Sequence, residues 1–375
     1  MLYKNAYIFL EGQFHYGSFR VEDGRFAAIS DIVPAEPGVD LDGAYVIPGL
    51  VDMHCHGSAG ADFSDGDYEG LVAMARYLAE NGITSFAPTS VTLPYGSLEK
   101  AFRTGKCLYE EKPAGCARLM GIHMEGPFLS AQKKGAQKEA YLQAPDFAAF
   151  QMLQDSCNGL VKLVDVAPEL PGAAEFIRKA SDFCTVSVAH TAASYEEARA
   201  AFAVGAGHVT HLFNGMSPVH HRAPGVVGAA FEKDTVTAEM ICDGVHVHPA
   251  MVKMAFRLFS GRIVLVSDSL RCCGMPDGEY CLGGQRVFLR NGTATLADGT
   301  VAGGAMNLYA CMKHAIKFGI PKEEAILSAT LHPAKVLGCD KEVGSLAPGK
   351  RADFVVCDKD LNRKQVYLAG IKAGN

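Results

Sequence analysis

The sequence predicts a (β/α)₈ barrel together with a small β-domain that both ends of the chain build. The chain is β-rich at both ends, and between them short apolar runs alternate with longer amphipathic stretches. The apolar runs that we assign to barrel strands are residues 45–54, 85–88, 119–123, 161–166, 186–190, 209–212, 238–242 and 263–266. On this pattern alone, an open doubly wound sheet is the alternative.

The β-rich character of the two ends comes from alternation and turns. In YKNAYIFLEGQFHYGSFRVEDGRFAAIS, aromatic and β-branched residues alternate and are interrupted by Glu-Gly and Asp-Gly turns. The last segment, GSLAPGKRADFVVCDKDLNRKQVYLAG, has the same texture. Each segment is too short to fold well alone, so we expect them to pair with each other. The predicted small domain comprises residues 1–47 and 342–375, and the predicted barrel comprises residues 48–341.

Helical patterns lie between most of the predicted barrel strands. In DYEGLVAMARYLAENG the apolar side chains share one face and a glycine follows the end; that face holds Leu71, Met74, Ala75 and Leu78. In SYEEARAAFAVG, Ser194 is a predicted N-cap, Glu197 completes a capping box, and Gly205 ends the helix.

Composition excludes several classes of protein. With 375 residues, 49% of them hydrophobic and 20% charged, the chain can bury a large core, which excludes wholesale disorder. A net charge of −6 argues against a nucleic-acid or polybasic membrane role. No apolar run is long enough for a transmembrane helix, and the start has no signal-peptide pattern. The 12 cysteines form no CxxC pair and often lie in apolar runs, which favours free thiols in a reducing cytoplasm.

Histidines gather at the ends of the predicted strands. His54 and His56 lie two residues apart in PGLVDMHCHG, so in an extended strand both imidazoles point to one side and can reach one metal ion. The alternative is a pair of ordinary surface histidines. His190 ends the fifth strand and His211 ends the sixth, whereas we expect His208 to start the sixth.

Carboxylates occupy equivalent places. Glu125 follows the third strand in GIHMEGPFLS, and Asp268 follows the eighth in RIVLVSDSL. The alternatives are a solvated loop glutamate and an aspartate that caps a helix. His123 lies two residues before Glu125, and we expect it to be buried and hydrogen-bonded. His246 projects into the loop after the seventh strand.

The occurrence of these side chains at several strand ends favours a metal site over the separate explanations for each residue. Five predicted strands deliver a histidine or a carboxylate to the C-terminal end of the barrel, which is its functional face. Three protein ligands plus water make a catalytic metal site, and an aspartate beside the metal can accept a proton from that water.

The same motifs resemble the amidohydrolase superfamily and, within it, the N-acetylglucosamine-6-phosphate deacetylases. PGLVDMHCHG, HMEGPFL, VAHTAAS, THLFNGMSP, DGVHVHP, LVSDS and GSLAPGKRADFVV occur in the order and spacing of that family, over nearly the whole chain. HMEGPFL and HLFNGM are the most specific. The resemblance implies a (β/α)₈ barrel with a small β-sandwich domain formed by both termini.

The resemblance also implies roles for the residues at the strand ends. The main metal ligands match Glu125, His190 and His211, while His54 and His56 match a pair that suggests a second ion bridged by Glu125. Related enzymes bridge the ions with a carboxylated lysine, which this chain lacks at that place. Asp268 matches the general base and acid, and His246 matches the residue that polarises the amide carbonyl.

A further set of positions matches segments that contact the sugar phosphate. Asn214 and Gly215 match a segment that lines the sugar, and Met306 belongs to a GGAM segment near it. Arg222 matches an arginine that reaches the phosphate across a homodimer interface, with His221 beside it; the alternative for Arg222 is a surface ion pair. Gln137 stands where many relatives have a histidine near the sugar, which leaves the sugar epimer open.

The implied reaction is deacetylation of N-acetylglucosamine 6-phosphate by a cytoplasmic enzyme with one or two divalent ions. Histidine and carboxylate ligands suit Zn²⁺, Fe²⁺, Mn²⁺ or Co²⁺. N-acetylgalactosamine 6-phosphate is an alternative substrate. A cyclic-amide hydrolase of the same superfamily is a second alternative, which the missing lysine disfavours, and a catalytically inactive scaffold is a third, which the complete ligand set disfavours.

Overall fold

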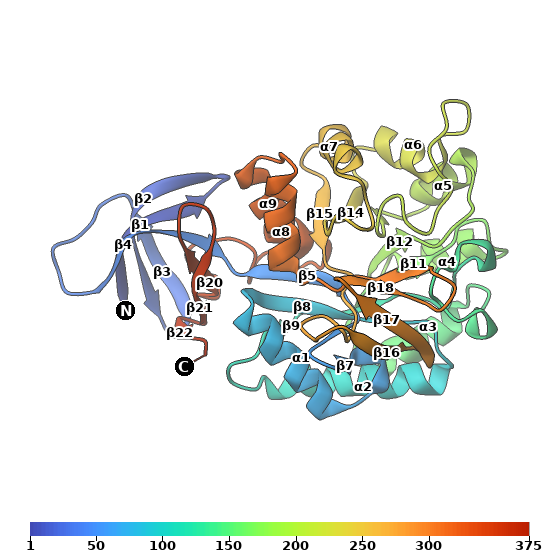
Figure 1. Cartoon of the computed structure of the whole chain (residues 1–375), viewed down its shortest axis with the longest axis horizontal. Helices are drawn as coiled ribbons and strands as arrows, with labels where there is room; N and C mark the ends of the chain where they lie inside the picture. The colour runs from blue at the N-terminus through green and yellow to red at the C-terminus, as the bar shows by residue number, and fades with distance from the viewer. Residues whose placement is uncertain (375) are drawn as a thin grey trace.

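The computed structural model describes residues 1–374, in which most strands belong to a small sheet or to a barrel. Figure 1 shows the small sheet beside one end of the barrel, with both chain termini on the small sheet. Within the described residues no helix is long and apolar enough to cross a membrane. All 12 cysteines are free thiols, as predicted.

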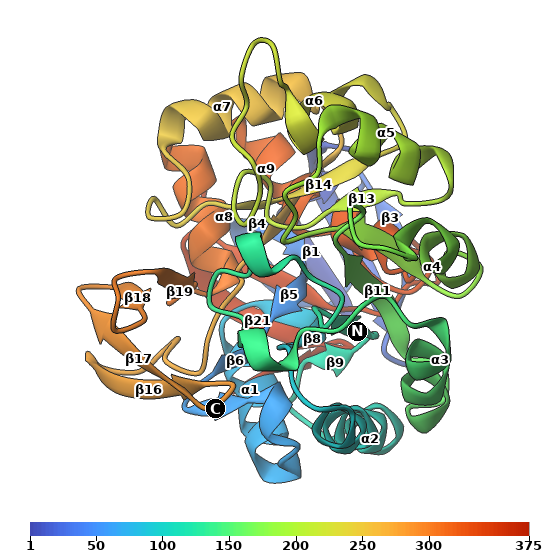
Figure 2. The same cartoon turned by 90° about the vertical axis from the view of Figure 1, so that its right-hand side faces the viewer.

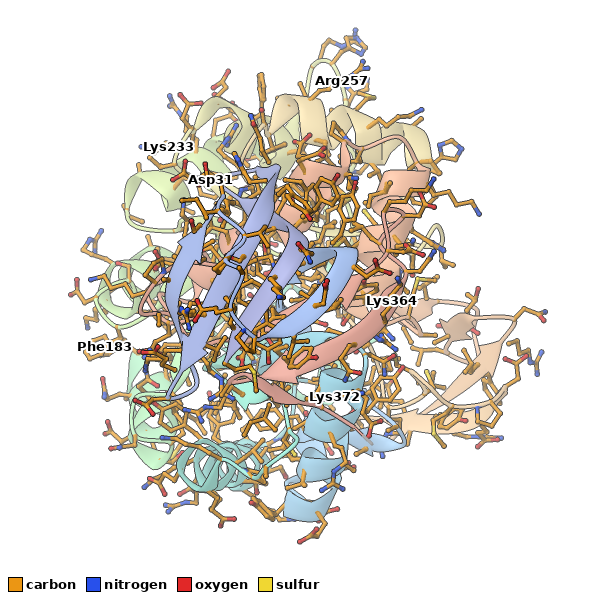
Figure 3. All side chains as sticks on the ribbon, turned by 90° about the vertical axis from the view of Figure 1, so that its left-hand side faces the viewer. Asp31, Phe183, Lys233, Arg257, Lys364 and Lys372 are labelled. Atoms are coloured by element: carbon orange, nitrogen blue, oxygen red, sulfur yellow. The ribbon has the colours of Figure 1, made fainter. Side chains whose placement is uncertain are left out.

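The small sheet joins the two ends of the chain. Its N-terminal strands are β1 (Leu2–Leu10), β2 (Gln13–Glu22), β3 (Arg25–Ser30) and β4 (Val39–Pro48), and its C-terminal strands are β20 (Phe354–Cys357), β21 (Arg363–Leu368) and β22 (Ile371–Lys372). The order is β22-β21-β20-β4-β1-β2-β3, with β20 antiparallel to β4. Figure 3 looks onto this sheet from outside, with Lys364 and Lys372 on its C-terminal strands.

This sheet curls around an aromatic core of its own. Tyr3 on β1 stacks on Phe19 of β2, with ring centroids 4.9 Å apart. Phe26 on the edge strand β3 lies 6.0 Å from Phe354 on β20, although three strands separate them in the sheet order. The edge strand β3 therefore faces β20 across this aromatic core. The two ends of the chain form a separate small β-domain, as predicted.

The barrel consists of parallel strands in chain order. Its described strands are β5 (Leu50–Cys55), β8 (Ile83–Ser90), β10 (Ile122–Met124), β11 (Val161–Val166), β12 (Thr185–Val188), β13 (His208–Val209), β14 (Thr237–Ile241) and β15 (Ile263–Val266), with β9 (Arg118–Leu119) paired to β8. A parallel bridge between Cys55 and Ser269 joins the end of the first strand to the segment that follows the last. This closure confirms the barrel and excludes the open sheet.

Helices cover the outside of the barrel. They are α1 (Tyr68–Glu80), α2 (Tyr95–Glu111), α3 (Phe147–Ser156), α4 (Ala173–Ala180), α5 (Tyr195–Ala203), α6 (Gly225–Glu232), α7 (Pro249–Leu258), α8 (Leu308–Lys317), α9 (Lys322–Ala329) and α10 (Leu331–Val336). The predicted apolar face of α1 is buried. Ser194 and Glu197 form the predicted capping box of α5. Both helix predictions are confirmed.

The prediction of one strand over residues 45–54 is wrong, because these residues form parts of two strands that belong to different sheets. Gly49 lies between β4 and β5, and its N–H donates to the carbonyl of Asp353, 3.0 Å away. A Cβ at Gly49 would lie 2.1 Å from Oγ1 of Thr84, so the crossing from the small sheet to the barrel requires glycine.

An antiparallel sheet that the sequence analysis did not identify follows the last barrel strand. It consists of β16 (Gly278–Leu282), β17 (Gln285–Arg290), β18 (Thr293–Thr295) and β19 (Val301–Gly303). Figure 2 shows this sheet at the side of the barrel. A short hairpin, β6 (Gly57–Ser58) and β7 (Ala61–Asp62), follows β5.

Candidate active site

A pocket of about 210 Å³ collects the side chains that end the barrel strands. Its lining includes His56, Glu125, His190, His211, His246 and Asp268. Leu282 of β16, Thr300 and the residues of β19 form part of its wall. A larger groove of about 690 Å³ lies between the small sheet and the barrel, but no metal-ligating cluster of residues 1–374 lines it. The chemistry of the lining, rather than size, therefore identifies the site.

Glu125, His190 and His211 form the first cluster. The Nε2 atoms of both histidines lie 3.1 and 3.2 Å from Oε1 of Glu125, and 3.1 Å from each other. Nδ1 of His190 donates to the carbonyl of Lys133, and Nδ1 of His211 to that of Asn214. In neutral rings both Nε2 lone pairs then face a carboxylate oxygen, so the space between them requires protons or a metal ion.

His54, His56 and Asp268 form the second cluster. Nε2 of His56 lies 3.1 Å from Oδ1 of Asp268 and 3.4 Å from Oε2 of Glu125. Nε2 of His54 lies 3.4 Å from Oδ1 of Asp268, is fully buried, and has no hydrogen-bond partner. An orphaned buried nitrogen among carboxylate oxygens fits a missing cation. Glu125 lies within reach of both clusters.

Three site residues adopt a left-handed backbone conformation. The φ angles are 41° at His190, 30° at His211 and 48° at Asp268. Residues other than glycine rarely adopt these φ angles, and backbone strain of this kind is typical of functional sites. Here each residue directly follows or closely follows a strand, and the turn directs its side chain into the pocket.

The electrostatics of the site favour positive charge. Burial alone raises the pKa of Glu125, but hydrogen bonds from His190 and His211 hold that pKa well below its usual range. Burial also raises the pKa of Asp268, and the nearby His54 and His56 outweigh it, so that pKa is lowered too. Burial lowers the pKa of His211, yet Glu125 and Asp268 raise it to about 9. In the absence of metal, the raised pKa of His211 favours a proton where a cation would bind.

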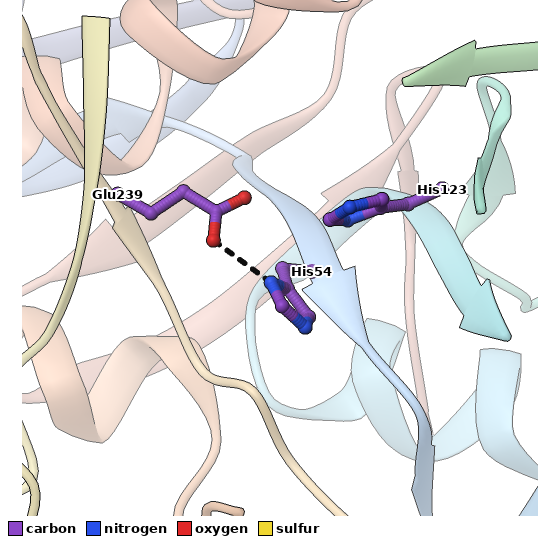
Figure 4. A group of neighbouring side chains, drawn as sticks. All are labelled: His54, His123 and Glu239. Carbon is purple, nitrogen blue, oxygen red and sulfur yellow. Dashed lines mark hydrogen bonds and ion pairs between the residues drawn. The ribbon is translucent and has the colours of Figure 1, made fainter. Parts of the chain in front are cut away.

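The structure adds buried carboxylates that the sequence analysis missed. Glu239 on β14 lies 2.8 Å from Nδ1 of His54, and His123 lies beside them (Figure 4). These three side chains are close enough to suggest a further ion. However, His123 bonds through Nδ1 to the carbonyl of Met53 and through Nε2 to Asp165, so it offers no free nitrogen. His123 is buried and hydrogen-bonded, as predicted.

The predicted sugar-binding residues divide into two groups. Asn214, Gly215 and Gln137 line the pocket. A Cβ on Gly215 would lie 2.8 Å from Nδ1 of His190, so the segment needs glycine there. Arg222 and His221 are exposed and pair with each other in this single chain, and Met306 packs against the barrel core; these last three are not part of the described pocket lining.

Both polar atoms of the Gln137 side chain already make hydrogen bonds within the protein. Its Oε1 accepts from the backbone N–H of Thr92 at 2.7 Å, and its Nε2 donates to Oε2 of Glu125 at 2.5 Å. Because a backbone N–H can only donate, the orientation of the amide follows from chemistry. Contact of Gln137 with a sugar would compete with these bonds, so its role in sugar binding stays a prediction.

His246 is oriented by the turn that precedes it. Oδ2 of Asp243 lies 2.7 Å from Nδ1 of His246, and Oδ1 accepts the backbone N–H of the same residue at 2.9 Å. Burial raises the pKa of Asp243, but the bonds to His246 outweigh it and lower that pKa. Nε2 of His246 is therefore the nitrogen available to the pocket.

A closed parallel barrel with histidine and carboxylate clusters at the C-terminal ends of its strands defines the class of metal-dependent barrel hydrolases. Residues 45–373 match the Amidohydrolase family, and the chain belongs to this family. Amidohydrolases depend on metal, and the two clusters around Glu125 are able to bind it.

Similar proteins cover nearly the full chain. N-acetylglucosamine-6-phosphate deacetylase of Bacillus subtilis is 37% identical over 92% of this chain and 89% of its own length. N-acetylgalactosamine-6-phosphate deacetylase of Escherichia coli is 35% identical over 96% and 95%. A solved structure of a mutant N-acetyl-D-glucosamine-6-phosphate deacetylase from Mycobacterium smegmatis, in complex with N-acetyl-D-glucosamine-6-phosphate, has a TM-score of 0.93, 32% identity, and coverage of 100% and 99%.

Proposed function

We propose that this chain hydrolyses the N-acetyl group of N-acetylglucosamine 6-phosphate and releases glucosamine 6-phosphate and acetate. The observation that carries the proposal is the convergence of two ligand clusters on Glu125 in one pocket. The relatives named for this activity support it. The catalytic unit is the barrel of residues 48–341, and residues 1–47 and 342–375 form the accompanying small domain.

The residues fit one or two divalent ions per chain. Glu125, His190 and His211 would hold one ion, and His54 and His56 would hold a second that shares Glu125. Imidazole and carboxylate ligands suit Zn²⁺, Fe²⁺, Mn²⁺ and Co²⁺. When bound, such an ion lowers the pKa of water and polarises an amide carbonyl.

Asp268 transfers the proton, and His246 stabilises the negative charge that develops on the substrate. Asp268 accepts the proton of the attacking water and then passes it to the leaving nitrogen, which departs as an amine. Its place in the second cluster and on the pocket wall supports both steps. His246 lies against the developing negative charge on the carbonyl oxygen, with its ring oriented by Asp243.

Sugar and phosphate recognition involve two groups of residues. Asn214 and Gly215 line the sugar together with Gln137, and the GGAM segment that ends at Met306 lines the pocket beside them. The chain forms a homodimer in the cytoplasm, in which Arg222 and His221 of one subunit bind the phosphate in the pocket of the other. The exposure of this pair in the single chain supports the assignment, because neither residue lines its own pocket.

N-acetylgalactosamine 6-phosphate is the second candidate substrate. The relative named for that substrate is 35% identical, nearly the same as the relatives named for the glucosamine compound. The two sugars differ only in the orientation of one hydroxyl group, so the same chemistry serves both.

An acetate-release assay on a panel of N-acetylated sugar phosphates tests the proposal, with the metal content measured on the same sample. We expect turnover that requires bound metal and is fastest with one of the two hexosamine 6-phosphates. Unphosphorylated sugars serve as the control for phosphate recognition. Metal-loaded protein that releases no acetate from any of these substrates would contradict the proposal.

A further inference from the structure

Glu239 is a fully buried carboxylate inside an apolar strand, and nothing in the proposed reaction uses it. We propose that Glu239 is a positioning residue that supports the ligands of both metal clusters from the interior of the barrel. The inference rests on the proposed function, since it assigns Glu239 a part in holding the metal ions of that same site.

One oxygen atom of Glu239 joins the two clusters. Oε2 lies 2.8 Å from Nδ1 of His54, which belongs to the second cluster (Figure 4). The same atom accepts the backbone N–H of His211 at 2.9 Å, and His211 belongs to the first cluster. His54 lies on β5 and His211 follows β13, so a single side chain on β14 connects ligands from distant parts of the chain.

The bond to Oε2 fixes which nitrogen of His54 faces the ions. An ionised carboxylate has no hydrogen to donate, so Nδ1 of His54 must carry one. In the neutral ring Nε2 then presents its lone pair to the space beside Asp268 and Glu125, 3.4 and 3.7 Å away. Without Glu239, the hydrogen can move to Nε2, where it would block an ion.

The bond to His211 fixes the backbone at a residue in a strained, left-handed conformation. His211 has a φ of 30°, which costs free energy unless surrounding contacts hold it. Glu239 anchors the N–H of this same residue, just before the side chain turns towards Glu125. The carboxylate therefore supports a ring tautomer in one cluster and a backbone turn in the other.

The second oxygen of Glu239, Oε1, makes no hydrogen bond within the described fold. The exposed fraction of Glu239 is 0%. Nε2 of His208 is 3.5 Å from Oε1 and also has no hydrogen-bond partner. A buried carboxylate is costly unless positive charge lies nearby, and ions bound through His54 and His211 provide that charge.

Two substitutions separate the charge of Glu239 from its hydrogen bonds. Glu239→Gln keeps an acceptor oxygen for His54 and His211 and removes the charge, while Glu239→Met removes both. Asp165→Asn is the matched control, because Asp165 is also fully buried in the barrel but bonds to His123 and Thr210, which are not predicted ligands.

The test measures ions bound per chain across a series of metal buffers, on folded full-length protein checked by circular dichroism. Loss of this kind of supporting bond typically weakens metal binding 10–100-fold. We expect Glu239→Met to weaken it by about 100-fold and Glu239→Gln by about 10-fold, with Asp165→Asn close to wild type.

Each outcome supports or overturns the inference. Wild-type affinity in both Glu239 variants overturns it, and so does an equal loss in Asp165→Asn, because any buried carboxylate would then serve. If Glu239→Met does not fold, the Gln variant against the Asn control decides alone. Wild-type protein that binds no ion at all overturns the proposed function itself. This result is distinct from a loss of metal affinity that appears only in the variants.

Discussion

Replacement of Gln137 by methionine should destabilise the metal-free protein, because the amide connects Thr92 to Glu125 inside the site. The exchange preserves length and burial but removes the donor to Oε2 of Glu125 and the acceptor for the Thr92 N–H. A hydrogen bond to a charged group contributes about 1.5–3 kcal/mol, and a buried N–H without a partner costs about 1–3 kcal/mol. We expect the free energy of unfolding to fall by about 3 kcal/mol.

Urea denaturation of metal-stripped protein measures this change, with Gln151→Met as the control. Gln151 on α3 donates to the exposed Asp155 at 2.8 Å, so the same exchange there should alter stability by less than about 0.5 kcal/mol. An equally small change for Gln137→Met would show that these two bonds do not stabilise the fold. The KM of the metal-loaded variant then separates two roles: a raised KM without loss of stability would place Gln137 on the sugar rather than on Glu125.

Other predictions concern the proton, the second subunit and pH. Asp268→Asn should keep the fold but lose about 10²–10⁴-fold in kcat, and near-normal turnover would remove Asp268 from the mechanism. Mixing an Asp268→Asn protein with an Arg222→Ala protein under subunit exchange should restore part of the activity; no recovery despite proven exchange would place Arg222 in its own subunit or outside the site. The pKa of about 9 at His211, above the unfolded value near 6.5, stabilises the metal-free fold fully below pH ~6.5. That contribution is lost as the pH rises through about 9, so Tm should fall more between pH 7 and 10 in metal-free wild type than in a His211→Asn variant; parallel curves would contradict this.

The barrel was predictable because its signals are local. Each strand is a short apolar run, and capping residues such as Ser194 and Glu197 lie within one turn of the helix they begin. The break at Gly49 was not predictable, because it depends on Thr84 and Asp353, which are remote in sequence. The insert of β16–β19 was missed although Gly-Gly and Asn-Gly turns mark it.

The pocket residues show the same division between local and remote signals. Glu125 and His211 were identified because each stands where a strand ends, next to turn residues. Glu239 was missed because a single glutamate within an apolar strand has no distinguishing local pattern, and its partner His54 lies 185 residues away. Gln137 was assigned to the sugar from the resemblance, whereas its bond to Glu125 is visible only in three dimensions.

The small sheet imposes an order on how the newly synthesised chain matures at the ribosome. β4 is among the first strands to emerge, but its antiparallel neighbour β20 begins only at Phe354. Until then one edge of β4 is open to other chains, and open strand edges promote aggregation. The nascent chain therefore exposes this edge during the whole synthesis of the barrel, and a chaperone that covers β4 would act throughout that interval.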